Sequence, residues 1–321
     1  MNRRQFNLMA LGSMLMPSAA ISSSEFRNSS RFDISISQWS FHRAMFGASR
    51  DDNAKFKQAL HSNPDEVLMG TMDPREITKV ARELGVSTVD LVNVLWFGHP
   101  QDKAWLKEFK QRAKDDGISF KLLMCDETGS IGSSNAKLQK QAIENHVPWM
   151  EAAAELGCTQ LRVNAYGDGT YLERLNQCAE GLSSLSEIGL EYGLEVLVEN
   201  HGYQSNVGAW LAMLIEKTAH DNCGVFLDFD NFFMGGWNIE PPRWYDRYQG
   251  IMDLAPYAKG ISAKAHDFDA AGRETTIDYD RCMDILFAAN FQGTYSAEFE
   301  GDRLSEYEGS KKTIELFKRY Q

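Results

Sequence analysis

The sequence predicts a single-domain α/β fold, the (β/α)8 or TIM barrel. Helix-like segments stop at a glycine, a strand-like run follows at once, and this unit recurs at intervals of 32, 40, 36, 31, 36 and 33 residues. A glycine just past a helix readily takes the left-handed conformation that ends it, so each is expected to terminate a helix. Alternating strand and helix units are typical of a TIM barrel. The glycines are Gly85, Gly117, Gly157, Gly193, Gly224, Gly260 and Gly293.

The first strand is expected over residues 32–39 (FDISISQW), and one further strand after each glycine brings the number to eight. The sequence also predicts a helix start at residues 73–76, because Asp73, Pro74 and Glu76 supply an N-cap, a proline at the first helical position and a capping carboxylate. An open doubly wound sheet is the alternative fold. Its G-x-G-x-x-G nucleotide motif follows none of these strands. We therefore expect one barrel over residues 32–321.

Composition and charge restrict the class of partner. The chain has 321 residues, 43% of them hydrophobic, and a formal net charge of -12 at pH 7. Such a charge repels phosphate backbones and anionic lipid, so nucleic acid and stable membrane association are not expected. A small molecule or a cation fits this surface better. The five cysteines are scattered and odd in number, with no C-x-x-C, and predict neither a disulfide framework nor a zinc-thiolate site.

The N-terminus resembles a bacterial export signal. Arg3 and Arg4 precede a short apolar run and a stretch of small residues, the order found in twin-arginine signal peptides. We assign residues 1–24 to this signal and 25–31 to a linker, and expect a periplasmic or otherwise exported protein. A plain amphipathic helix is the alternative. The apolar run is shorter than the roughly 20 residues needed to span a bilayer.

Charged side chains gather at the ends of four predicted neighbouring strands. Glu199, Asp228 and Glu298 end three of them, and Lys264 and His266 belong to the strand between the last two. The carboxyl ends of barrel strands form the mouth that carries active sites. Several carboxylates this close cannot all stay ionised without a compensating cation. We therefore expect one divalent metal there, with Mn²⁺, Co²⁺, Mg²⁺ and Zn²⁺ all compatible with oxygen and imidazole ligands.

Five segments, VENHG, LDFDNF, YDRY, SAKAHDFDAAGRETTIDY and SAEFEGD, resemble the xylose isomerase-like barrels of the sugar phosphate isomerase/epimerase superfamily, here in an exported branch. The resemblance covers about residues 32–321. It implies that Glu199, Asp228 and Glu298 bind the metal. The family usually has H-x-K on the seventh strand, and Ser262 stands in the place of that histidine. We expect His266 to substitute as the fourth ligand, and otherwise a site with three protein ligands or a weak one.

Each of these residues also has a purely structural interpretation. Glu199 could form a salt bridge with Arg162 in the barrel core, Lys264 could neutralise a neighbouring carboxylate, and His266 could be a histidine satisfied within a loop. The sequence alone leaves these alternatives open.

Aromatic and polar residues near the mouth suggest a carbohydrate substrate. Aromatic faces suit the C–H face of a sugar ring, while arginine, asparagine and histidine side chains bind hydroxyl groups. No glycine-rich phosphate cradle is present, so a free sugar is expected rather than a phosphorylated one. The substrate-binding candidates are Trp39, His42, Arg162, Asn164, His201, Lys264 and Trp237.

The expected reaction is proton abstraction beside a carbonyl, giving an enediolate. Glu199 and Glu298 would take and return the proton, which makes the protein a metal-dependent sugar isomerase or epimerase. One alternative is a lyase or hydrolase that expels the substituent of a 3-keto-glycoside from the same enolate, and a second is a non-catalytic sugar-binding barrel. Endonuclease IV-like cleavage needs a histidine-rich zinc site and a basic face, which 7 His and a net charge of -12 do not provide. The sequence leaves open whether the chain forms a homo-oligomer.

We predict that replacing Arg3 and Arg4 by lysine traps the precursor inside the cell, because the paired arginines are the feature that the translocase recognises. Immunoblots of periplasmic and cytoplasmic fractions would measure this. Normal export of the variant, or export in cells that lack the translocase, would contradict the assignment.

Overall fold

The computed structural model of the chain describes residues 32–235 and 239–321, and Phe32–Gln321 form one compact unit. The predicted signal peptide (1–24), the predicted linker (25–31) and Trp237 lie outside the described residues. Within the described ranges, no helix is both long and apolar enough to cross a membrane.

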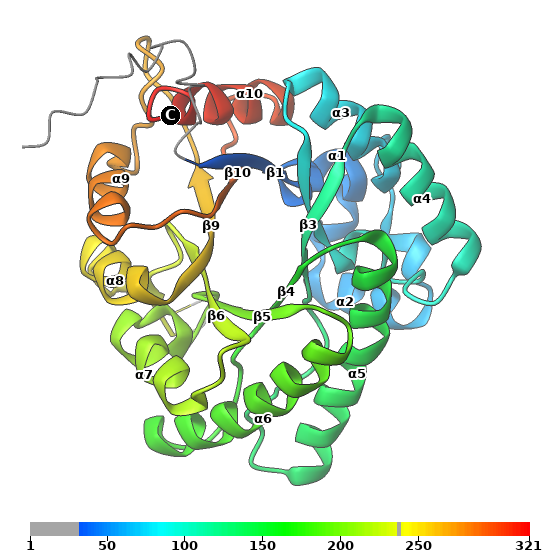
Figure 1. Cartoon of the computed structure of the whole chain (residues 1–321). Coiled ribbons are helices and arrows are strands. Elements are labelled where there is room, and N and C mark those ends of the chain that lie inside the picture. The colour runs from blue at the N-terminus through cyan, green and yellow to red at the C-terminus, as the bar shows by residue number, and fades with distance from the viewer. Residues whose placement is uncertain (1–31, 236–238) are drawn as a thin grey trace, which may run out of the picture. The chain divides into compact units, whose positions relative to one another are not determined.

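Eight parallel strands close into a barrel in the order β1-β10-β9-β6-β5-β4-β3-β2 (Figure 1), which confirms the predicted fold. Because β5, β6, β9 and β10 are consecutive neighbours in this order, the four strand ends that carry the predicted charged cluster lie side by side. The strands are β1 (Asp33–Ser37), β2 (Thr88–Val92), β3 (Ser119–Met124), β4 (Gln160–Val163), β5 (Glu195–Glu199), β6 (Cys223–Asp228), β9 (Ala258–Ala265) and β10 (Thr294–Phe299).

Helices surround the barrel and connect successive strands (Figure 1). They are α1 (His42–Phe46), α2 (Asn53–Ser62), α3 (Ile77–Leu84), α4 (Lys103–Asp116), α5 (Ala136–Leu156), α6 (Tyr171–Glu191), α7 (Gly208–Thr218), α8 (Arg247–Leu254), α9 (Tyr279–Ala288) and α10 (Glu306–Phe317). Short 3-10 turns occur at η1 (Gln38–Phe41), η2 (Gly47–Asp51), η3 (Pro64–Val67), η4 (Pro74–Glu76), η5 (Asn93–Trp96), η6 (Gln204–Asn206) and η7 (Ala255–Tyr257). After β6, the strands β7 (Phe233–Met234) and β8 (Arg243–Trp244) form a small antiparallel pair.

Only part of the predicted glycine pattern acts as helix caps. Gly85, Gly117 and Gly157 occupy the position after a helix with left-handed backbones, as expected, and the predicted capping box between Asp73 and Glu76 is present.

Gly224 and Gly260, however, lie inside β6 and β9 instead of ending helices. A Cβ on Gly260 would approach the Phe226 ring to 3.0 Å, and one on Gly224 would approach the Lys259 side chain to 2.7 Å. These two glycines therefore make room for neighbouring side chains. In the sequence alone, a glycine needed for this reason looks the same as one that ends a helix.

Strand alternation directs the functional side chains into the barrel. A Cβ on Gly189 of α6 would lie 2.8 Å from Val196, so Val196 faces the helices. Successive side chains of a strand point to opposite faces, hence Leu197 and Glu199 face the interior. Val196 and Leu197 are fully buried on the two sides of β5, while Glu199 ends the strand at the mouth.

A buried histidine on α5 makes the stability of the fold depend on pH. His146 Nδ1 lies 2.7 Å from the Ala142 carbonyl oxygen, which can only accept, so Nδ1 carries the proton and Nε2 accepts from the Thr128 hydroxyl at 2.9 Å. Burial lowers the pKa of His146 to about 4. Between about pH 6.5 and 4 the unfolded chain binds a proton that the folded chain does not, so stability falls as the pH drops through this window.

We predict that the free energy of unfolding of wild type falls by about 3 kcal/mol between pH 7 and pH 4 because of His146. His146→Gln should remove this part of the loss. Urea unfolding of both proteins at several pH values would measure the difference. His61→Gln, on the exposed face of α2, is the matched control. Parallel pH profiles for wild type and His146→Gln would contradict the prediction.

Candidate active site

Lys264 lies at the centre of a buried acidic cluster at the mouth. Its Nζ is 3.5 Å from Asp228 Oδ2, 3.5 Å from Glu298 Oε1 and 3.4 Å from Glu300 Oε2. Burial alone would lower the pKa of Lys264, but Asp228, Glu300 and Glu298 outweigh it and raise this pKa well above the usual range. The ammonium group is therefore a fixed positive charge of the mouth.

The Asp228 carboxylate is held in place on both oxygens. Oδ1 accepts hydrogen bonds from the backbone amides of Asp230 and Asn231, both at 2.7 Å, and Oδ2 accepts from the Ser262 hydroxyl at 2.8 Å. Ser262 is the residue that occupies the expected histidine position. Burial raises the pKa of Asp228 even though Lys264 opposes the rise.

Glu298 on β10 and Glu300, which directly follows this strand, differ in their protonation. Ser37 on β1 donates to Glu298 Oε2 at 2.7 Å, and burial raises the pKa of Glu298 to about 7. Glu300 Oε1 accepts from Trp39 Nε1 at 2.5 Å, and although burial opposes it, Lys264 holds the pKa of Glu300 below its usual range. Glu298 is therefore able to gain or lose a proton near neutral pH, while Glu300 remains ionised.

A second ion pair lies across the barrel mouth on β4 and β5. Arg162 Nε is 2.7 Å from Glu199 Oε2, and Arg162 Nη1 is 2.6 Å from Asp126 Oδ1. The Arg162 Nε–H is not aligned with Glu199 Oε2, so this contact is an ion pair without a hydrogen bond. Among the described residues, no donor forms a hydrogen bond with Glu199 Oε2. Burial raises the pKa of Glu199 well above its usual range against the effect of Arg162.

Asn164 and His201 continue this polar patch. Asn164 Nδ2 donates to Asp126 Oδ1 at 2.7 Å, and His201 Nδ1 lies 3.0 Å from Asn164 Oδ1 and 3.1 Å from the Tyr166 hydroxyl. Burial lowers the pKa of His201 to about 4, so the ring is neutral near pH 7. A neutral imidazole beside an amide and a phenol suits the recognition of uncharged hydroxyl groups.

Trp39 and His42 form an aromatic edge after β1. Their rings stack with centroids 4.6 Å apart, and the Arg50 guanidinium lies 4.8 Å from the Trp39 ring. Trp39 also reaches the acidic cluster through its indole N–H to Glu300. The predicted aromatic contact and the predicted carboxylates therefore belong to one continuous site.

The predicted metal ligands are not gathered into a metal-binding group. In residues 32–235 and 239–321, no group of three or more His, Cys, Asp and Glu side chains is arranged to hold a metal ion. Glu199 pairs with Arg162, Asp228 and Glu298 face Lys264, and His266 Nε2 lies 2.9 Å from Asp230 Oδ2. The structural alternatives considered for Glu199, Lys264 and His266 describe these contacts.

The sequence reasoning missed several residues of the site, among them Asp126, Ser37 and Tyr166. Asp126 lies two residues after the end of β3, so a search just past the strand ends could have found it. Ser37 shares the inward face of β1 by alternation, but a serine in that place gives no sign of a glutamate partner on the last strand. Tyr166 follows β4, and nothing in its local sequence indicates its contact with His201.

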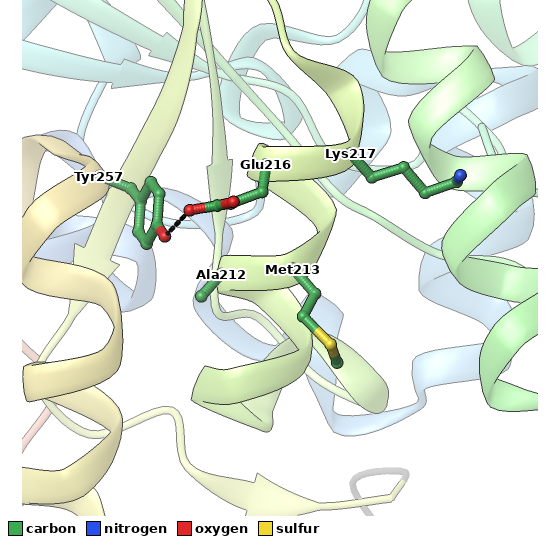
Figure 2. Close-up of a pocket in the computed structure, with 5 residues that line it drawn as sticks. All are labelled: Ala212, Met213, Glu216, Lys217 and Tyr257. Carbon is green, nitrogen blue, oxygen red and sulfur yellow. Dashed lines mark hydrogen bonds between the residues drawn. The ribbon is translucent and has the colours of Figure 1, made fainter.

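A separate surface pocket of about 580 Å³ lies on the helical layer, where α7 meets η7 (Figure 2). In it, the Tyr257 hydroxyl donates to Glu216 Oε1 at 2.5 Å, and Met213 is 52% exposed. Tyr257 immediately precedes β9, so the pocket is near the amino ends of the strands, away from the mouth. It holds no buried charged group, and we place the site at the mouth instead.

We predict that Arg162→Met destabilises the fold by about 3–5 kcal/mol, because it leaves the buried Glu199 and the half-buried Asp126 without their cation. Chemical denaturation would measure the loss. Arg112→Met is the matched control, since Arg112 pairs with Glu108 on the exposed face of α4, where a salt bridge contributes about 0–1 kcal/mol. Adding Glu199→Gln to Arg162→Met should recover part of the stability. Equal losses for Arg162→Met and Arg112→Met would contradict this account.

Comparisons with known proteins agree with this architecture. The family described as "Xylose isomerase-like TIM barrel" matches residues 78–320. A search of the curated proteins found no match. Among solved structures, the 3-keto-D-glucoside 4-epimerase of E. coli is 16% identical with a TM-score of 0.58, covering 76% of this chain and 94% of that one.

Two further solved structures have the same barrel. An L-ribulose 3-epimerase is 15% identical with a TM-score of 0.61, covering 90% of this chain and 94% of that one. The D-psicose 3-epimerase of Clostridium cellulolyticum H10, solved with D-tagatose, is 13% identical with a TM-score of 0.60, covering 78% of this chain and 93% of that one. At these identities the likeness shows a shared fold, and the family match covers well over half of the sequence. The chain belongs to the xylose isomerase-like TIM barrel family.

Proposed function

We propose that the protein is a sugar epimerase or isomerase that moves a proton at the carbon next to a carbonyl group. One observation carries the proposal: Glu199 and Glu298, two buried carboxylates with raised pKa values, end strands on either side of the buried cation Lys264. The neighbouring structures that are named as sugar 3- or 4-epimerases support this class of reaction.

The proposed step needs one carboxylate that accepts a proton and one that donates it. Burial of several acids around two cations leaves part of them protonated, and the pKa of Glu298 is about 7. A glutamate thus tuned is an effective general acid or base near neutral pH. Glu199 on β5 and Glu298 on β10 are separated by two strands, so they approach a substrate from different sides of the mouth.

The electron movement is simple. One glutamate removes the proton from the carbon beside the carbonyl. The C–H electron pair forms a C=C double bond, and the π pair of the carbonyl moves to its oxygen, which gives the enediolate. Return of a proton to the same carbon from the opposite face gives the epimer. Return of a proton to the former carbonyl carbon, with the hydroxyl proton of the first carbon passing to the enediolate oxygen, gives the isomer. Lys264 and Arg162 are the fixed positive groups able to stabilise the developing oxyanion.

The surroundings of the carboxylates support a free sugar as substrate. Trp39 places its indole N–H on Glu300 at the edge of the site, and Asn164 and His201 offer neutral hydrogen-bonding groups. The family resemblance implies a divalent metal as well, but because the described residues gather no group for one, the steps above use only groups of the chain. The proposed location remains the periplasm, where unphosphorylated sugars and glycosides are available.

Elimination from a 3-keto-glycoside would start from the same enolate, with the C1 substituent leaving instead of a proton returning. We treat this lyase reaction as an outcome to be distinguished by experiment. It would release an aglycone, whereas epimerisation and isomerisation release nothing.

We predict that wild-type protein incorporates deuterium from D₂O beside the carbonyl of a ketose or 3-keto-sugar. Glu199→Gln or Glu298→Gln should lower the exchange rate by about 10²–10⁴-fold, because an amide cannot carry the proton. Nuclear magnetic resonance of the recovered sugar would measure both. Glu195→Gln is the matched control, since Glu195 is on the same strand as Glu199 but pairs with Lys259 at the far end.

Exchange that is unchanged in both variants would remove the two glutamates from the mechanism. Neither exchange nor aglycone release by wild type, over a panel of ketoses, aldoses and 3-keto-glycosides, would favour a sugar-binding barrel instead.

A further inference from the structure

We propose that Lys264 takes the place of a divalent metal, so that this barrel carries its cation covalently and binds no metal at the mouth. That the ammonium also stabilises the oxyanion rests on the proposed function. That it is the resident cation rests on contacts of the described residues alone.

The surroundings of the Lys264 Nζ resemble the surroundings of a bound cation. Three carboxylate oxygens lie 3.4–3.5 Å from it, from Asp228, Glu298 and Glu300. The Asn231 Oδ1 atom adds a fourth oxygen at 3.3 Å. Four oxygens from the ends of two strands, β6 and β10, thus surround one buried nitrogen, and the ammonium charge would repel a second cation.

Two of the three carboxylates predicted to bind a metal already accept hydrogen bonds. Asp228 accepts two backbone amides on Oδ1 and the Ser262 hydroxyl on Oδ2, and Glu298 Oε2 accepts from Ser37. An imidazole at position 262 would offer a metal a nitrogen lone pair. The hydroxyl of Ser262 instead donates a hydrogen bond to the carboxylate, so it orients Asp228 toward the ammonium.

The remaining predicted ligands have partners of their own. His266 is 2.9 Å from Asp230, and Asp230 in turn contacts Arg247, so the imidazole is held outside the cluster. Glu199 is paired with Arg162. Each acid of the predicted metal set therefore has a cationic or hydrogen-bonding partner within the chain, and the replacement is consistent across the whole mouth.

The chemistry of such a site differs from that of a metal site. An ammonium group donates hydrogen bonds and carries one charge, so it stabilises an enediolate oxygen by donation instead of by direct coordination. A chelator would have nothing to remove, and the reaction would proceed in its presence.

The first experiment measures metal in the full-length mature protein. After dialysis, elemental analysis of wild type should find less than about 0.1 equivalent of Mn, Co, Mg or Zn per chain, and EDTA should change neither the Tm nor the D₂O exchange rate. One equivalent of metal retained through dialysis, together with a Tm lowered by EDTA, would overturn the inference.

The second experiment rebuilds the metal site. Lys264→Met with Ser262→His removes the ammonium and supplies an imidazole, and this variant should bind about one Co²⁺ per chain, seen as visible d–d absorption and a Tm raised by the metal. The matched control, Lys264→Met with Ser262→Ala, should bind Co²⁺ at least about tenfold more weakly. Wild type that binds Co²⁺ as tightly as the rebuilt variant would overturn the inference.

The two proposals fail separately. If wild type contains no metal and catalyses no exchange on any sugar, Lys264 remains the proposed cation, but the proposed epimerase activity is contradicted. If EDTA abolishes the exchange and added metal restores it, the proposed epimerase activity is supported, but the proposal that Lys264 replaces the metal is contradicted. If circular dichroism shows that the Lys264→Met, Ser262→His variant is unfolded, the metal content and EDTA measurements on wild type still test the inference.

Discussion

The mouth of this barrel depends on one electrostatic constraint: buried carboxylates need positive charge close by. Asp228, Glu298 and Glu300 surround Lys264, and Glu199 and Asp126 share Arg162. Desolvation penalises every one of these groups, so each ion is tolerable only with its partners in place. The two cations thus decide where each carboxylate points, and with it which oxygens remain available to a ligand.

The barrel produces this arrangement through the geometry of its strands. Parallel strands bring their carboxyl ends to one rim, and alternation sends every second side chain inward. In register, Glu298 lies beside Lys264 and Asp228 beside Ser262, so contacts between β6, β9 and β10 follow directly from strand pairing. The outward apolar faces of the same strands, such as Val196 on β5, pack against the helices.

Much of this was predictable from the sequence, because strand ends and alternation are local properties. The positions of Glu199, Asp228, Glu298 and Lys264 followed from them. The pairing of these groups did not, since a long side chain reaches several partners and the choice depends on distances between strands. The sequence suggested a metal to offset the same excess of carboxylates that Lys264 and Arg162 offset in part in the structure.

Two other differences have the same origin. Gly224 and Gly260 read as helix stops, yet what they provide is space for Lys259 and Phe226, which are neighbours only once the sheet has formed. His266 continues the inward alternation of β9, but the strand ends at Ala265 and the following segment carries the imidazole to Asp230. Local patterns therefore predict elements well and long-range neighbours poorly.

The hydrogen bond from Ser37 to Glu298 joins the first strand of the barrel to the last. Glu298 acquires this hydrogen bond only when β10 pairs with β1, which requires nearly the whole chain to have left the ribosome. A partly synthesised or partly folded molecule thus lacks part of the arrangement on which the proposed reaction depends. For a protein proposed to work after export, catalytic competence is in this way tied to the completion of folding.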